Sequence, residues 1–406
     1  MSDDIENVLV LQGGGSLGAF GCGVYKALAK SNLKIDIIAG TSIGGLNASI
    51  IAGSKEDHPE KALEQYWLEL AEGSSNNDMN FNFPFLQDKP SLSPYSSFSE
   101  YRTPPIASTT TSIGHSEIRH ISQIKSLISF YSSATYGNKK VFLPRWMPEY
   151  SFTDPQYYTP YKWTYLYDHS PLIKTMEKYV DFNKLRPKGN PNSRLIITAV
   201  NVLTAEPLIF DSSKQQITSK HILATTGYPA YYFQWAEVDK GVYAWDGSLL
   251  SNTPLREVIE ASPVKDKRIF LVENYPKNID KLPDNIHDVQ HRSRDIMFSD
   301  KTLHSVQMSK AFTYYLRFID ELYYMIQDRL DLENKEDQTK FEKIKSKYKR
   351  LVEDHRAEIK NIFYITRDER LPSLYENADF AIGTIKSSIN DGELKTIQIL
   401  KDKGFI

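Results

Sequence analysis

The first 53 residues alternate short apolar runs with segments of small residues. The runs at 8–11 (VLVL) and 35–39 (IDIIA) are apolar enough for buried strands, and helices are predicted to begin near Leu17 and Ile43. Strands that alternate with helices predict a parallel sheet with helices on both faces. The pattern therefore indicates an α/β fold.

This pattern breaks off between residues 74 and 164. Serine, threonine, proline, asparagine and aromatic residues dominate there, and the only periodic stretch predicts a helix at 115–132. Such a long irregular segment is either a functional cover or partly disordered.

Ordered elements are predicted again after residue 170. The apolar runs at 194–202, 268–276 and 361–369 predict further strands, and residues 221–228 predict a helix that stops before Pro229. We therefore divide the chain into a core at 1–275, which contains the insertion at 74–164, and a C-terminal extension at 276–406 with a returning strand.

Residues 300–358 of this extension have strong helical spacing. The polar stretch 333–338 (ENKEDQ) predicts the turn of an antiparallel helical pair. Packing of the apolar stripes against the chain's own core is favoured over a coiled-coil partner. The stripes are Ala311, Tyr315, Phe318, Leu322 and Met325, and then Phe341, Ile344, Tyr348, Leu351 and His355.

Composition and charge are those of an ordinary soluble protein. A formal net charge of −2 gives no reason to expect a nucleic acid partner. The single cysteine, Cys22, excludes an internal disulfide framework and suits a reducing compartment. The acidic N-terminus is unlike a secretory signal, and no apolar run is long enough to span a membrane. We therefore expect a cytoplasmic protein, and the oligomeric state stays open.

The first motif with chemical meaning follows the first predicted strand. In QGGGSLG, Gly13, Gly15 and Gly18 have the spacing G-x-G-x-x-G, which can cradle a dinucleotide pyrophosphate. The same amides can instead hold the oxyanion of a tetrahedral acyl intermediate. A dinucleotide site expects an acid at the end of the second strand. Asp36 lies near the start of that strand, which argues against an NAD or NADP cofactor.

The second motif follows the second predicted strand. Gly40, Ser42 and Gly44 form G-x-S-x-G, which places a serine on a sharp turn between a strand and a helix. The positive end of the helix that begins at Ile43 favours negative charge developing on the serine oxygen. This context predicts Ser42 as a nucleophile.

A serine nucleophile needs a base, which is less easily found in the sequence. Of the nine histidines, none follows a clear strand end with small neighbours. His169 and His221 are the nearest candidates, and both are more typical of surface or packing residues. The most conspicuous acid is Asp246, which follows an aromatic strand and precedes Gly247, although an isolated D-G is usually only a turn.

In this order, the glycine-rich loop, G-x-S-x-G and D-G-S resemble the patatin-like phospholipase family, and most closely its bacterial and archaeal branch with a C-terminal extension. The resemblance covers residues 8–70 and 165–275. It implies a three-layer α/β sandwich and a dyad without histidine, in which Ser42 attacks and Asp246 takes its proton. The other residues that it implies are an oxyanion hole of Gly13, Gly14 and Gly15, supported by Gly18, Gly40, Gly44, Gly247 and Pro229.

Three motifs depart from the pattern of the relatives: the glycine-rich loop, the D-G-S motif and the stretch 224–230 (ATTGYPA). In the D-G-S motif, Ser248 stands where the family has glycine or alanine, a change between small residues. Ser16 and Leu17 stand where many relatives carry a basic residue, so the resemblance does not assign the loop a phosphate-binding role. Thr225 and Gly227 stand where relatives usually have other small residues. The substrate class is therefore no narrower than carboxylic esters of lipids.

The aromatic residues of the insertion suggest a lid. They would line an acyl-chain groove or touch a bilayer interface, where aromatic residues with polar tips are favoured. Packing onto the domain is an equal alternative. The residues are Phe130, Tyr131, Trp146, Tyr157, Tyr158, Tyr161, Trp163 and Tyr165.

The sequence therefore predicts a serine acyl hydrolase that cleaves lipid esters and uses neither a metal nor a cofactor. Its expected partners are a lipid or another ester, with peripheral membrane contact as a hypothesis. The alternatives are an inactive lipid-binding protein on the same fold, an acyltransferase and, remotely, an NAD(P)-binding oxidoreductase. Head group, chain length and positional preference are not predicted.

Overall fold

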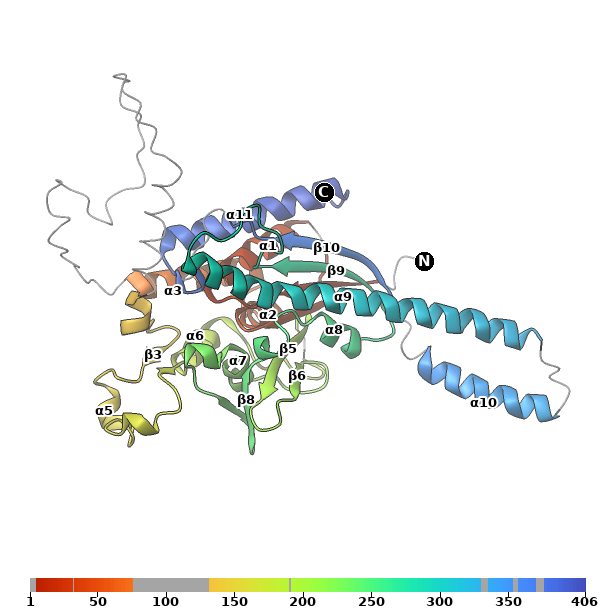
Figure 1. Cartoon of the computed structure of the whole chain (residues 1–406), viewed down its shortest axis with the longest axis horizontal. Coiled ribbons are helices and arrows are strands. Elements are labelled where there is room, and N and C mark those ends of the chain that lie inside the picture. Colours follow the sequence, from red (N-terminus) through yellow and green to blue (C-terminus); the bar gives the residue numbers. More distant parts are fainter. Residues whose placement is uncertain are drawn as a thin grey trace, which may run out of the picture.

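An eight-stranded, mostly parallel sheet forms the centre of the molecule (Figure 1). The computed structural model describes residues 5–31, 33–75, 131–189, 191–329, 335–352, 357–369 and 376–406. The sheet has the strand order β10-β9-β1-β2-β5-β8-β7, and β6 pairs with β5 beside this path. Its strands are β1 (Ile5–Leu11), β2 (Ile37–Thr41), β5 (Arg194–Asn201), β6 (Pro207–Asp211), β7 (Ala236–Asp239), β8 (Val242–Asp246), β9 (Asp266–Glu273) and β10 (Ile359–Thr366).

The strands from β10 to β5 run parallel, whereas β6 and β8 are antiparallel to β5. The carboxyl ends of β1 and β2 therefore meet at one edge of the sheet, where the glycine loop and the G-x-S-x-G motif follow them. Crevices at this end of parallel strands are the usual binding positions of open α/β sheets.

Helices cover both faces of this sheet. The described α-helices outside the insertion are α1 (Gly18–Lys30), α2 (Ile43–Ala52), α3 (Pro59–Ser75), α6 (Pro171–Tyr179), α7 (Ser219–Thr226), α8 (Leu255–Ala261), α9 (Ile286–Gln327), α10 (Lys335–Leu351) and α11 (Ile382–Asp402), of which α10 lies away from the sheet (Figure 1). Alternate residues of β1 point to opposite faces, as a period of two requires. Leu9 and Leu11 join the larger core with α1, α2, α3, α7 and α11, whereas Val8 and Val10 join the smaller core with α8. The predicted three-layer α/β fold is confirmed.

The end of the chain is built into the same sheet and core. β10 pairs with β9, and Ile385 and Ile389 of α11 are buried in the larger core. α11 also packs tightly on α1, because a Cβ added to Gly23 would lie 1.8 Å from the carbonyl oxygen of Ile389. The returning strand predicted at 361–369 is therefore confirmed as part of β10.

The first helix of the pair, α9, differs from its prediction in the face that it buries, whereas α10 buries Phe341 and Tyr348 of its predicted stripe against α9. α9 runs out beyond the sheet, and α10 lies along its far part (Figure 1). The two helices pack on one another through Leu316, Tyr323, Phe341 and Tyr348. The predicted stripe on α9 is exposed, with Tyr315 at 62% and Phe318 at 53%, so its expected packing on the core is wrong.

The turn of this pair was also predicted too long. Residues 335–338 of the ENKEDQ stretch already belong to α10, and 333–334 lie outside the described residues. Within the part of the chain that the structure describes, no helix has the length and apolar character needed to cross a bilayer.

Part of the insertion lies outside the described residues, including most of the helix predicted at 115–132. The described part, from residue 131, contains only short elements. Residues 131–136 are helical, and they are followed by β3 (Leu143–Pro144), α5 (Tyr150–Thr153), η3 (Pro160–Lys162) and β4 (Tyr167–Asp168). Asn138 ties this segment to α3 by donating to the Leu70 carbonyl at 2.9 Å. Tyr158 and Tyr161 are largely exposed, whereas Trp163 and Tyr165 flank the Arg145 guanidinium.

Two glycines let α2 approach the sheet. A Cβ added to Gly40 would lie 2.2 Å from the backbone of Gly44, and one added to Gly44 would lie 2.2 Å from the Leu11 carbonyl oxygen. Backbone cannot yield as a side chain can, so the motif needs glycine at both positions.

We expect Gly44→Ala to lower the free energy of unfolding by about 3 kcal/mol or more, because overpacking here displaces backbone. Gly383→Ala is the matched control, since a Cβ there meets nothing within 4 Å and lies inside α11. It should stabilise by about 0.5–1 kcal/mol. Urea unfolding of both variants tests this, and equal effects would contradict it.

Candidate active site

Ser42 occupies the sharp turn between β2 and α2. Its backbone has φ 57° and ψ −129°, a combination that residues with a side chain rarely adopt. The Ser42 amide donates to the hydroxyl of Thr225 at 3.0 Å, and its carbonyl accepts from Leu46 as the first turn of α2. The strained turn is thus held from α7 and from its own helix.

Asp246 ends β8 with its carboxyl group buried. The side chain is 1% exposed, and Oδ1 accepts from the Ser248 amide at 2.8 Å. Burial raises the pKa of Asp246 to about 6, although the Ser42 hydroxyl and Ser248 oppose the rise. Oδ2 is buried and completes no hydrogen bond among the described residues. This oxygen is therefore available to accept a proton.

Sheet register brings these two residues together. Thr41 pairs with Thr198 of β5, and the next residue of β5, Ala199, pairs with Asp246. Ser42 and Asp246 therefore lie at the same level on either side of β5. The Thr41 and Thr198 hydroxyls are joined by a 2.7 Å hydrogen bond just below them.

The glycine loop lies directly beside Ser42. A Cβ added to Gly13 would lie 3.0 Å from that of Ser42. The Gly13 amide already donates to the Asn252 carbonyl at 3.3 Å. Among the hydrogen bonds of the described residues, none uses the amide of Gly14 or Gly15, whose φ values are 153° and 59°. Of the three predicted oxyanion donors, these two are therefore free for a ligand.

A pocket of about 390 Å³ opens onto Ser42, Asp246 and the glycine loop. Most of its wall is apolar and comes from segments that lie far apart in the sequence. The aromatic and aliphatic lining residues include Leu46, Tyr66, Leu70, Val141, Phe142, Tyr167, Leu172, Tyr228, Phe233, Tyr275, Phe298 and Phe380. Of the aromatic residues predicted to line an acyl groove or touch a bilayer, Phe130 lies outside the described residues and the other seven do not line this pocket. The groove alternative is therefore wrong for these seven residues, whereas contact with a bilayer stays a prediction. Phe142 and Tyr167 take their place.

The remaining predicted residues, which are Pro229, Gly18 and Gly247, lie next to the site and pack against its elements. Pro229 begins η4 (Pro229–Tyr231), whose neighbours form one wall of the pocket. A Cβ added to Gly18 would lie 2.7 Å from Ile43, and one added to Gly247 would lie 2.5 Å from the Thr198 hydroxyl. Asp36 lies just before β2, at the opposite end of the strand from Ser42, and accepts from the Asn7 amide.

Neither histidine considered from sequence is bonded to Ser42. His169 lies in the pocket wall, but its Nε2 lies 2.9 Å from the Leu223 carbonyl oxygen. His221 forms a capping box with Thr218 at the start of α7. Burial lowers the pKa of both rings. Their packing roles agree with what the sequence indicates.

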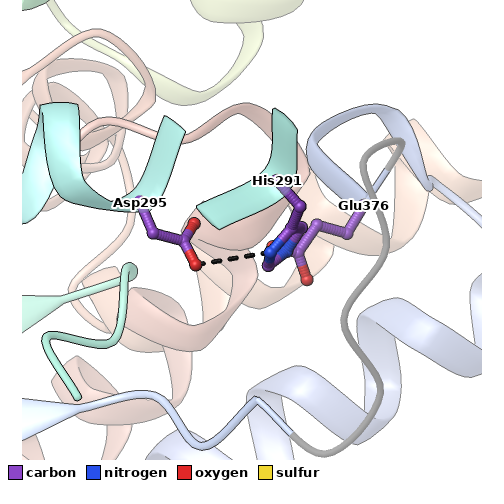
Figure 2. A group of neighbouring side chains, drawn as sticks. All are labelled: His291, Asp295 and Glu376. Carbon is purple, nitrogen blue, oxygen red and sulfur yellow. Dashed lines mark hydrogen bonds and ion pairs between the residues drawn. The ribbon is translucent and has the colours of Figure 1, made fainter. Parts of the chain in front are cut away.

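A buried charge cluster lies behind the glycine loop, and its members come from beyond residue 285. It consists of His291, Arg294, Asp295, Arg367, Glu369 and Glu376. Figure 2 shows His291 and Asp295 on α9 facing Glu376. Donor atoms of these three lie within 4.8 Å of one another, a spacing compatible with a metal ion.

The arginines argue against a metal in this cluster. Arg294 lies 2.6 Å from Glu376 and 2.9 Å from Asp295, and Arg367 lies 3.0 Å from Glu376. Burial lowers the pKa of His291, but Glu369 and Glu376 outweigh it and raise the pKa to about 9. Three cationic groups thus face three carboxyl groups. We interpret the charge cluster as an ion-pair network.

Several of these contacts could not be inferred from the sequence. Asn377, which lines the pocket, follows no motif and belongs to a polar stretch near the end of the chain. Asn252 follows the D-G-S motif and is buried with its Nδ2 atom unpaired among the described residues. Thr225 is one of the departures from the family pattern, and the structure shows that its hydroxyl holds Ser42.

We expect Asp246→Asn to stabilise the protein, and more so at high pH. The pKa is raised in the folded state, so the unfolded chain loses its proton first and stability falls as pH rises from about 4 to 6. The neutral amide of the variant does not titrate, so the variant avoids this loss of unfolding free energy. The loss is about 3 kcal/mol at pH 8 and about half of that at pH 5. Urea unfolding at both pH values measures it.

Asp280→Asn, at an exposed position, controls for the change in net charge. A gain for Asp246→Asn that is equal at the two pH values would contradict a raised pKa at Asp246.

This chain resembles a solved structure only distantly. The crystal structure of VipD from Legionella pneumophila matches at 13% sequence identity with a TM-score of 0.36, over 98% of this chain and 67% of that one. The comparison with curated proteins gives no match.

The sequence profile of one family matches far more specifically. It is described as "Patatin-like phospholipase" and covers residues 9–259, which include the glycine loop, the Ser42 turn and the Asp246 strand. This is well over half of the chain. The protein therefore belongs to the patatin-like phospholipase family, whose members are in general lipid acyl hydrolases.

Proposed function

We propose that this protein is a serine acyl hydrolase that cleaves carboxylic esters of lipids through a Ser42–Asp246 dyad. The observation that carries the proposal is the buried Asp246 carboxyl, whose Oδ2 completes no hydrogen bond among the described residues. Asp246 and Ser42, which lies on its strained turn, line the same apolar pocket. An aspartate in water is too weak a base for this role. Burial brings its pKa closer to neutral pH, where a general base is most effective.

In the first half of the reaction, the Ser42 oxygen attacks the ester carbonyl carbon while its proton passes to Oδ2 of Asp246. Negative charge develops on the carbonyl oxygen, and the amides of Gly14 and Gly15 hold it. Collapse of the tetrahedral intermediate breaks the ester bond, and Asp246 returns the proton to the leaving alkoxide. The products of this half are a free alcohol and an acyl ester on Ser42.

In the second half, water takes the place of the alcohol. Asp246 accepts a proton from the attacking water, and the same amides hold the second oxyanion. Its collapse releases a carboxylic acid, and the proton returns to Ser42. Oxyanion donors of this kind are typically worth about 2.7–4 kcal/mol each in the transition state. Because the wall of the pocket is mostly apolar, we expect the acyl chain of the substrate to occupy it.

A fluorophosphonate probe tests the nucleophile directly, because Ser42 displaces fluoride from phosphorus only when its hydroxyl is activated. We expect an adduct on Ser42 by peptide mass spectrometry, none in Ser42→Ala, and labelling at least about 100-fold slower in Asp246→Asn. Ser213→Ala, at an exposed serine, is the control and should label like the wild type. A folded wild type that takes up no probe would contradict the proposal.

The pH dependence tests the base. We expect kcat/KM for a p-nitrophenyl ester to fall about tenfold per pH unit below pH 6, because protonated Asp246 cannot accept the serine proton. The residual activity of Asp246→Asn should not show this fall below pH 6. A wild-type profile that stays flat down to pH 4.5 would rule out Asp246 as the base.

A further inference from the structure

A short turn near the end of the chain completes the glycine loop from outside the region that defines the family. This turn, η7 (Glu376–Ala378), lies against η1 (Gly15–Leu17), more than 100 residues beyond the family match at 9–259. The Ser16 hydroxyl donates to the Glu376 carbonyl at 2.5 Å. A Cβ added to Gly15 would lie 2.2 Å from the Asn377 carbonyl oxygen, so the two backbones are in contact.

Asn377 makes the contact that bears on the orientation of the loop. Its Nδ2 donates to the Gly14 carbonyl at 3.0 Å and to the Tyr275 hydroxyl at 2.7 Å, and its Oδ1 accepts from Arg294. The Gly14 carbonyl and the Gly15 N–H belong to one planar trans peptide and point in opposite directions. Fixing the carbonyl on Asn377 therefore fixes the direction of the Gly15 N–H.

This anchor is needed because glycine alone does not fix a loop. Gly14 and Gly15 both adopt positive φ, and glycine has more backbone freedom than any other residue. An oxyanion donor is effective only when it is already aimed before the reaction. A hydrogen bond to the carbonyl also polarises the peptide and strengthens its N–H as a donor.

The charge cluster holds the turn in place. The Glu376 side chain contacts Arg294 and Arg367, with His291 at 3.3 Å, and Arg367 also donates to the Asn274 carbonyl at 2.9 Å. Asn274 in turn donates through Nδ2 to the Gly13 carbonyl at 3.1 Å. The turn is therefore bound to α9 and to the segments that follow β9 and β10.

We infer that Asn377 is a positioning residue of the proposed acyl hydrolase: it aims the Gly15 amide at the oxyanion, and the charge cluster fixes Asn377 itself. This inference rests on the proposed function. It gives the C-terminal extension a role in the chemistry of a site whose nucleophile and base lie in the first 250 residues.

Asn377→Asp tests this role, because it keeps the size of the side chain and replaces the Nδ2 donor by a carboxylate oxygen that repels the Gly14 carbonyl. We expect kcat to fall on the order of tenfold or more while KM changes little, since the contact acts in the transition state. Hydrogen exchange of the peptide spanning residues 12–17 should become faster. Asn377→Ala should show the same changes to a smaller extent.

Asn285→Ala is the matched control from the same extension. Asn285 caps the start of α9 by accepting from the Asp288 amide and does not line the pocket. It should lose stability without changing kcat or the exchange of residues 12–17. Equal falls in kcat for the Asn285 and Asn377 variants would overturn the inference, because general destabilisation would then explain both.

Two readouts separate this inference from the proposed function. If hydrogen exchange of residues 12–17 is unchanged in Asn377→Asp, the inference is overturned whatever the activity of the variant. Faster exchange with an unchanged kcat overturns it as well. Absence of the fluorophosphonate adduct in the wild type overturns the proposed function, and the catalytic role of Asn377 with it. Faster exchange together with a lower kcat supports the inference.

Discussion

Withdrawal of one carboxyl group from water is the constraint on which the rest of this site depends. Asp246 loses its hydration at the wall of an apolar pocket and regains only part of it from the Ser248 amide. The same burial makes the group a better base and a less stable ion. The fold can hold it because β5 fixes its level in the sheet and because Gly247 lets the following turn lie against Thr198. Strain at Ser42 is held in the same way, by packing that leaves the turn no alternative.

The local parts of this arrangement could be predicted from sequence. In G-x-S-x-G and in the glycine loop, a strand, a sharp turn and a helix follow one another within a few residues. The local backbone geometry of both motifs is therefore predictable from the sequence alone. Asp246 could not be assigned in this way, because D-G dipeptides mark turns throughout proteins. Asp246 was assigned from the family resemblance. It lies near Ser42 because both β2 and β8 pair with β5, and strand pairing of this kind produces no periodic pattern in the sequence.

The errors in prediction have a common cause. Helical spacing shows that α9 has apolar faces, but it does not tell which one meets a partner, and Leu316 and Tyr323 are buried rather than Tyr315 and Phe318. The aromatic residues of the insertion look like pocket residues by type alone, whereas the pocket uses Phe142 and Tyr167. Asn377 and the charge cluster have no motif, because their role arises only when distant segments meet.

The place of Asn377 in the chain has a consequence for the order in which the molecule is made. The proposed nucleophile, the proposed base and both glycine amides are synthesised before residue 250, whereas the last strand and the turn that contacts the glycine loop come more than 100 residues later. Contacts so distant in sequence form late in folding. A growing chain would thus carry the reactive groups with their loop still unanchored. A lipid hydrolase of the proposed kind, built in this way, would gain its full reactivity only once its last strand has joined the sheet.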